Sequence, residues 1–76
     1  MFLNRNMSVL AYANGFTLWH YKSNEESLEQ IERAGYFNKV QTLMAFGDII
    51  VINAKDGTAI RAVKELSPNI TIGQLS

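Results

Sequence analysis

The stretch "SVLAYANGFTLWHYKS", residues 8–23, contains two runs of β-branched and aromatic residues on either side of an Asn-Gly pair. Asn14-Gly15 accepts the positive φ values of a type I′ turn at little cost. The pattern therefore predicts a β-hairpin whose turn is defined by Asn14 and Gly15. Neither face of this hairpin is plainly polar.

The next stretch, "SNEESLEQIERAG", has the pattern of a short helix with both ends marked. Ser23 and Glu26 have the spacing of a capping box, and Gly35 stands where a left-handed C-cap is expected. Three apolar residues recur at helical spacing: Leu28, Ile31 and Ala34. A helix over residues 24–34 is predicted.

Helical spacing returns after Gly35, with Asn38 as its candidate cap. The apolar residues of this second stripe are Phe37, Val40, Leu43 and Met44. A second short helix is predicted over residues 38–45, and Gly47-Asp48 should end it. "IIVIN" then follows, and its branched residues on both faces predict the central strand of a sheet, buried on both sides.

Two further turns divide the remainder of the chain. Asp56-Gly57 predicts a hairpin turn into "TAIRAVKEL", and Pro68-Asn69 predicts a turn into a strand over residues 70–72. The expected fold class is therefore α+β: a small antiparallel sheet or partial barrel of about five strands, with two short helices inserted after the first hairpin. An open meander completed by strands of neighbouring chains is the alternative.

The N-terminal stretch "MFLNRN" carries no periodic signal. Residues 1–6 are predicted to be an N-terminal arm, disordered or reaching a neighbouring molecule, and residues 7–76 a single α+β domain. Either Met1 or Met7 fits as the native start.

Composition suggests that the chain associates with itself. A chain of 76 residues buries only about 60% of the surface of its unfolded form. Small domains often add disulfides, a metal or self-association, and this one has no cysteine and a single histidine. With 47% hydrophobic and 18% charged residues, some apolar surface is expected to face another chain.

Charge and hydropathy narrow the choice of partners. Seven basic and seven acidic residues cancel, so the basic surface expected of a nucleic-acid-binding protein is missing and nucleic acid is not an expected partner. No apolar run approaches the roughly 18 residues of a membrane span. The expectation is a soluble protein made inside a cell, with no membrane partner.

Catalytic and metal-binding patterns are weak. His20 and Asp48 are the only candidates for a small enzyme, but a strand histidine and a turn aspartate explain them better. One histidine without cysteines does not make a metal-ligand pattern. The five glycines are scattered, so no phosphate-binding loop is indicated. No catalytic residue, metal site or cofactor is predicted.

Three aromatic residues, two of them in the hairpin, are the candidates for packing. Trp19, Tyr21 and Phe37 are assigned to the core or to a subunit interface, because aromatic side chains dominate both. The alternative is a free-standing binding module whose aromatic hairpin holds a peptide, sugar or base. The aromatic residues of that hairpin are Tyr12, Phe16, Trp19 and Tyr21. Backbone turns are assigned to Asn14, Gly15, Gly35, Gly47, Asp48 and Gly57.

Two segments carry a resemblance that covers most of the chain from Met7 to Leu75. "ANGFTLWHY" and the series "AGYFN", Leu43, Gly47, Asp48 and Ile50 resemble a group of very small proteins encoded in phage and prophage structural regions. The resemblance implies a short α+β unit that forms homo-oligomers, often trimers, on the virion. It implies no active-site residue, and it does not cover the leader "MFLNRN".

The expected function is therefore that of a non-enzymatic virion structural protein. The roles that fit are a capsid cement or decoration protein and a component of a fibre base. The expected partners are further copies of the chain and other virion proteins such as the major capsid protein. The expected location is the virion, after synthesis in the bacterial cytoplasm.

Overall fold

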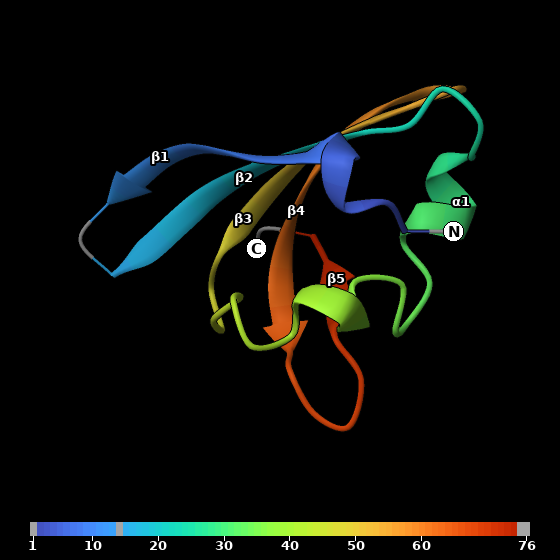
Figure 1. Cartoon of the computed structure of the whole chain (residues 1–76). Helices are drawn as coiled ribbons and strands as arrows, with labels where there is room; N and C mark the ends of the chain where they lie inside the picture. The colour runs from blue at the N-terminus through green and yellow to red at the C-terminus, as the bar shows by residue number, and fades with distance from the viewer. Residues whose placement is uncertain (1, 14, 75–76) are drawn as a thin grey trace.

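A computed structural model describes residues 2–13 and 15–74 and shows a single sheet of five strands in this part of the chain (Figure 1). The strands are β1 (Met7–Ala13), β2 (Phe16–Lys22), β3 (Ile49–Ala54), β4 (Gly57–Glu65) and β5 (Thr71–Gly73). Their spatial order follows the chain, from β1 at one edge to β5 at the other. The predicted number of strands and the central place of β3 are confirmed. The sheet is open, because β1 and β5 do not pair.

The expectation of an antiparallel sheet is wrong for one pair of strands. β2 and β3 run parallel, with Leu18 opposite Ile49 and Tyr21 opposite Ile52, whereas the other three pairs are antiparallel. Parallel neighbours require a connection that returns the chain to the end at which the first strand began. Residues 23–48 make that crossover, so the sheet is mixed.

Helical structure in the crossover is shorter than predicted. α1 (Leu28–Ile31) is a single turn, and the second predicted helix, residues 38–45, is replaced by the 3-10 helix η2 (Asn38–Val40) followed by turns. The apolar spacing is still used, since Val40 and Met44 are buried. Leu43, from the same stripe, is 66% exposed.

The capping box of α1 lies one turn later than predicted. Ser27 Oγ accepts a hydrogen bond from Gln30 N at 3.2 Å, and Gln30 Oε1 accepts one from Ser27 N at 2.9 Å. Ser23 Oγ instead accepts from the backbone N–H groups of Glu25 and Glu26, which forms a separate turn before the helix. The turn at Ser23 and the single helical turn of α1 therefore take the place of the one longer helix that was predicted over residues 24–34.

The hydrophobic core lies between one face of the sheet and the crossover, which passes in front of the sheet in Figure 1. Ile50 and Ile52 of β3 have no exposed surface, while Ile49 and Val51, on the opposite face, are half-buried. β3 is therefore central but fully buried on one face only. The buried core residues are Phe2, Trp19, Tyr21, Ile31, Phe37, Val40, Met44, Ile50, Ile52, Val63 and Ile70.

The segment expected to be an N-terminal arm contributes to this core. Phe2 is only 4% exposed, and the 3-10 helix η1 (Asn4–Asn6) leads from it into β1. An isolated aromatic residue gives no periodic signal in the sequence, so its burial becomes visible only in the folded chain. Met1 lies outside the described residues.

The turns follow the predicted positions with one shift. Gly15 has φ = 99° at the first hairpin, and Asn14, its predicted partner, lies outside the described residues. At the second hairpin Gly57 is not a turn residue but the first residue of β4, opposite Ala54. The turn itself consists of Lys55 and Asp56.

Two glycines of the crossover give a matched pair for testing. Gly35 and Gly47 have φ values of 85° and 92°, so alanine at either position should cost about 1 kcal/mol. A Cβ on Gly35 would also stand 3.3 Å from Asn38 Nδ2 and from Asn69 Oδ1, whereas a Cβ on Gly47 meets open space. We expect Gly35→Ala to lower the free energy of unfolding by about 2 kcal/mol in urea titrations, more than Gly47→Ala. Equal losses would contradict the described packing around Gly35.

Candidate functional site

The three aromatic residues assigned to core or interface all lie in the core of the single chain. Trp19 is 8% exposed, Phe37 is 1% exposed and Tyr21 has no exposed surface. Their rings therefore do not present a stacking surface for a base or a sugar. Of the four aromatic residues of the hairpin, only Tyr12 and Phe16 are exposed.

Four aromatic rings connect the N-terminus, β2 and the crossover. Phe2 stacks on Tyr21 with ring centroids 5.3 Å apart and an angle of 14° between the planes. Phe37 meets both of these rings edge to face, at 5.6 and 5.4 Å, and Tyr36 completes the group. Contacts of this kind add to the burial of apolar area, so we assign this group to stability.

A chain of hydrogen bonds leaves the aromatic group toward the surface. The Tyr36 hydroxyl donates to Glu26 Oε1, so the Tyr21 hydroxyl, 2.8 Å away, donates to Tyr36 and accepts from Leu3 N at 3.1 Å. Burial, together with the hydrogen bonds to Glu26 and Tyr21, raises the pKa of Tyr36 well above its ordinary value. Tyr36 is thus a proton donor held in its neutral form.

The raised pKa of Tyr36 predicts a loss of stability in alkali. An unfolded tyrosine ionises near pH 10, and the folded chain holds the Tyr36 proton more tightly. Its contribution is therefore complete below about pH 10 and is lost as the pH rises above that value. The urea midpoint of the wild type should fall between about pH 9 and about pH 11 by more than that of Tyr36→Phe. Parallel curves would contradict this assignment.

Asp48 is a buried carboxylate whose hydrogen bonds join β2 to the end of the crossover. Its side chain accepts from Thr17 N, from the Trp19 indole Nε1 and from Ala45 N, each at 3.0 Å. The residue is 2% exposed, so these three donors replace water around the charge. This arrangement explains Asp48 as a structural residue that positions the turn before β3.

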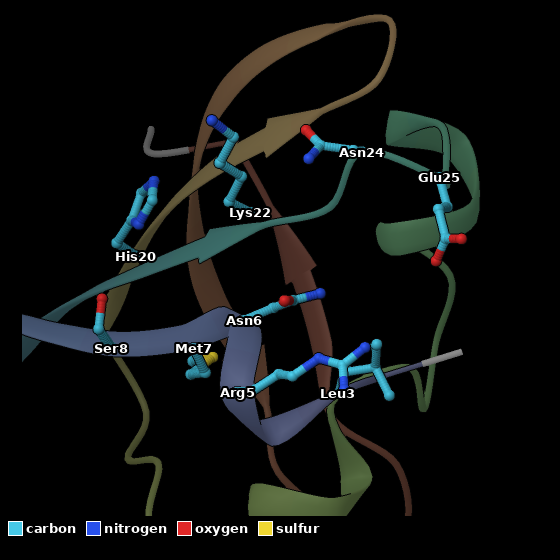
Figure 2. A pocket seen from close by; sticks show the side chains of 9 residues that line it. All are labelled: Leu3, Arg5, Asn6, Met7, Ser8, His20, Lys22, Asn24 and Glu25. Atoms are coloured by element: carbon cyan, nitrogen blue, oxygen red, sulfur yellow. The ribbon is translucent and has the colours of Figure 1, made fainter.

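A polar cleft of about 600 Å³ opens beside the strands β1 and β2 (Figure 2). Figure 2 shows Ser8, His20 and Lys22 on one side of the two strands, while Arg5 comes from η1. The lining residues are Leu3, Arg5, Asn6, Met7, Ser8, His20, Lys22, Asn24 and Glu25. Arg5 and Lys22 form no ion pair within the described residues, so the cleft offers two free cations.

His20 is held by its neighbours on β3 and β4. Asn53 Nδ2 lies 2.7 Å from His20 Nε2, and Asn53 Oδ1 accepts from the Thr58 hydroxyl at 2.8 Å. The amide nitrogen is a donor, so Nε2 of His20 is the acceptor in this hydrogen bond. The imidazole is oriented by its contact with β3, and the residue lines the cleft.

The structure does not bring His20 and Asp48 together. His20 and Trp19 are consecutive residues of β2 and point to opposite faces of the sheet, and Asp48 bonds to Trp19. No group of three or more His, Cys, Asp or Glu side chains suited to a metal occurs within the described ranges. In the same ranges, no helix has the length and apolar character needed to cross a membrane.

Exposed apolar side chains are further functional candidates, and of these the sequence pointed only to the aromatic residues Tyr12 and Phe16. Val9, Leu10, Tyr12 and Phe16, which we call the hairpin patch, are 39%, 54%, 81% and 37% exposed. Among the residues that the structure describes, the other large exposed apolar side chains are those of Leu43, Phe46 and Ile60. Val9 and Tyr12 lie on one face of the sheet and Phe16 lies on the other. A group of exposed apolar side chains on one hairpin favours an interaction site.

The hairpin patch is exposed because the hairpin extends beyond the segments that cover the core (Figure 1). Val9 pairs with Trp19, and Tyr12 pairs with Thr17, so both side chains lie on the core face of the sheet. The crossover covers that face over Trp19 but leaves Val9 and Tyr12 open. Phe46 is 70% exposed and lies in the turn before β3. Asp48 holds this turn next to β2, because its side chain accepts hydrogen bonds from Ala45 N and from Thr17 N.

One signal in the sequence pointed toward this surface. The predicted hairpin had no plainly polar face, which is unusual for a strand that borders solvent. That signal did not distinguish Trp19 and Tyr21, which are buried, from Tyr12, because burial depends on where the crossover lies. Phe46 stood outside the predicted apolar stripe and gave no signal.

Comparison of the chain with family models, with curated proteins and with solved structures finds no match. The proposals that follow therefore rest on the exposed surface, the cleft and the resemblance described above.

Proposed function

We propose that this chain is a non-enzymatic structural subunit that acts as a homo-oligomer. The single observation that supports this most is the hairpin patch: four large apolar side chains exposed on one projecting hairpin. Burying apolar area stabilises association by about 25 cal/mol per Å² before the costs of association are subtracted. A second copy of the chain is the partner that is always present when the protein is made.

The charge balance of the chain supports association between identical copies. Seven basic and seven acidic residues leave a net charge of zero, so copies approach each other without net repulsion. Part of the face of the sheet opposite the core is also apolar, because Leu18, Val51 and Ile60 point to it beside the polar residues of the cleft. A structural subunit surrounded by neighbours would use both surfaces.

The proposed setting is the virion of a phage or prophage. This part of the proposal rests on the resemblance carried by "ANGFTLWHY", "AGYFN" and Gly47-Asp48. Within a particle the chain would act as a capsid cement or decoration protein or as a component of a fibre base, in contact with proteins such as the major capsid protein. Repeated copies on a symmetric shell suit a small subunit that associates through apolar faces.

Purified particles test this setting. Particles induced from cells that encode the chain are separated on a density gradient, and their proteins are quantified by mass spectrometry. The proposal expects the chain in the particle fraction, in many copies and in a constant ratio to the major capsid protein. Recovery of the chain only in the unassembled fraction would contradict it.

A second candidate function is favoured by the cleft, not by the buried aromatics. Arg5, Lys22 and the oriented His20 would suit a small anionic ligand in a free-standing binding module. Titration with inorganic phosphate, followed through the amide signals of residues 5–8 and 20–25 by NMR, tests this function. Saturable shifts that Lys22→Gln weakens would support it, and the absence of shifts at millimolar phosphate would reject it.

A further inference from the structure

β1 forms one edge of the sheet, and its outer side has no neighbouring strand in the described part of the chain (Figure 1). It pairs only with β2 over its seven residues, Met7–Ala13. An edge strand presents a row of unpaired N–H and C=O groups, which is a template for another strand. The outer side of β1 is therefore a surface with both apolar side chains and free backbone groups.

Natural edge strands usually carry features that prevent pairing with another molecule. Common features are charged side chains, proline and short length. β1, with the sequence MSVLAYA, has no charge and no proline, and it is longer than the three-residue edge strand β5. Its one irregularity is a bulge between Val9 and Ala11. The strand lacks most of the protection that a solvent-facing edge normally has.

We propose that β1 pairs in antiparallel fashion with β1 of a second copy, so that one sheet continues through two subunits. This inference rests on the proposed function as a homo-oligomer and specifies its interface. The other free edge, β5, covers only Thr71–Gly73, too few residues to match β1. Pairing β1 with itself matches equal lengths and gives the self-complementary contact that twofold symmetry requires.

The bulge determines the register of this pairing. Leu10 and Ala11 together occupy the single position opposite Leu18, so Val9 lies one position before the bulge and Tyr12 one position after it. A twofold axis through the bulge places Val9 of each copy opposite Tyr12 of the other. Both side chains lie on the core face of their sheet. The twofold axis gives two equivalent Val9–Tyr12 pairs, and each pair buries two exposed apolar side chains against each other.

Cysteine cross-linking tests this register, because the chain has no cysteine of its own. Directly opposite residues lie within the Cα separation of about 4.4–6.8 Å that a disulfide needs. We expect an equal mixture of Val9→Cys and Tyr12→Cys to form mixed disulfide dimers under mild oxidation. Each variant alone should not form a disulfide dimer. Identical positions of the two copies are offset by two positions along the strands, or about 6.6 Å, in addition to the distance between the strands. Thr71→Cys, on β5, is the control and should not cross-link to either.

Charge substitutions give an independent test. In the double variant Val9→Lys with Tyr12→Lys, each lysine faces another lysine, and the association constant should fall at least about tenfold. Val9→Lys with Tyr12→Glu places opposite charges together and should restore most of that loss. Both variants change exposed residues, so circular dichroism should show the same fold. Equal weakening by the two variants would overturn the register.

The outcomes separate this inference from the proposed function. A wild-type chain that stays monomeric rejects the homo-oligomer and the interface together. A wild-type oligomer with no cross-link between positions 9 and 12, or with one between positions 9 and 71, overturns the β1 pairing and leaves the homo-oligomer standing. Pairing through β1 joins two copies and leaves no free β1 edge for a third. A stable trimer would therefore also overturn it.

Discussion

Asp48→Asn should lower the free energy of unfolding by about 3 kcal/mol, a large part of the roughly 4–11 kcal/mol expected for a chain of this length. The carboxylate accepts from three N–H donors while it is 2% exposed. An amide keeps one accepting oxygen and turns its NH₂ group toward the remaining donors. At least one of the three N–H groups then faces the NH₂ group instead of an acceptor, which is the source of the loss.

The control for this prediction is a second aspartate at a turn. Asp56 Oδ1 accepts from Leu28 N at 2.9 Å, but the residue is exposed. Asparagine keeps that acceptor, so Asp56→Asn should cost no more than about 0.5 kcal/mol. Urea unfolding followed by circular dichroism, with all proteins at one concentration, measures both. Similar losses for the two variants would contradict the structural role of Asp48.

Phe2→Ala should cost about 3–5 kcal/mol, the usual loss for a buried phenylalanine. The ring is 4% exposed and contacts Tyr21, Tyr36 and Phe37. A chain that starts at Met7 loses this ring and also the hydrogen bond from Leu3 N to the Tyr21 hydroxyl. We therefore expect the shortened chain to be at least as unstable as Phe2→Ala.

Phe46→Ala is the matched control, because it removes the same side chain from a site that is 70% exposed. Its effect on the free energy of unfolding should stay within about 0.5 kcal/mol. Thermal and urea unfolding at one protein concentration measure the stability of Phe2→Ala, of Phe46→Ala and of the chain that starts at Met7. Full stability of the chain that starts at Met7 would contradict the role of Phe2 in the core.

The sequence predicts the strands well because their signals are local. The branched run after Asp48 identifies β3, and Asn-Gly and Asp-Gly pairs place the hairpins to within one residue. The direction of β3 relative to β2 is not a local property, because it depends on the path of residues 23–48. That path made the sheet mixed, where the sequence pattern favoured an antiparallel one.

Competing local signals explain the error in the helices. Ser23 with Glu26 and Ser27 with Gln30 both have the spacing of a capping box. In the folded chain the second pair caps α1, and Ser23 forms a turn of its own. No rule of spacing chooses between them. The choice depends on contacts from elsewhere in the chain, such as Asp56 accepting from Leu28 N.

The candidate surface was the part least visible in the sequence. Trp19 and Tyr12 are both aromatic residues of one hairpin, yet one is 8% and the other 81% exposed. The difference arises because β1 is an edge strand and the crossover stops over β2. Strand order and the limits of the crossover are tertiary properties, so a pattern of residue types indicates that apolar surface exists but not where it lies.

The molar mass of the wild-type chain in solution is the most direct test of the central claim, that this is a self-associating structural subunit. Sedimentation equilibrium over a range of micromolar concentrations, with the Val9→Lys, Tyr12→Lys variant beside it, gives the mass. We expect an even multiple of the monomer mass of 8.6 kDa for the wild type, and dissociation toward 8.6 kDa for the variant. A wild-type chain that remains a folded monomer of 8.6 kDa at every concentration would contradict it.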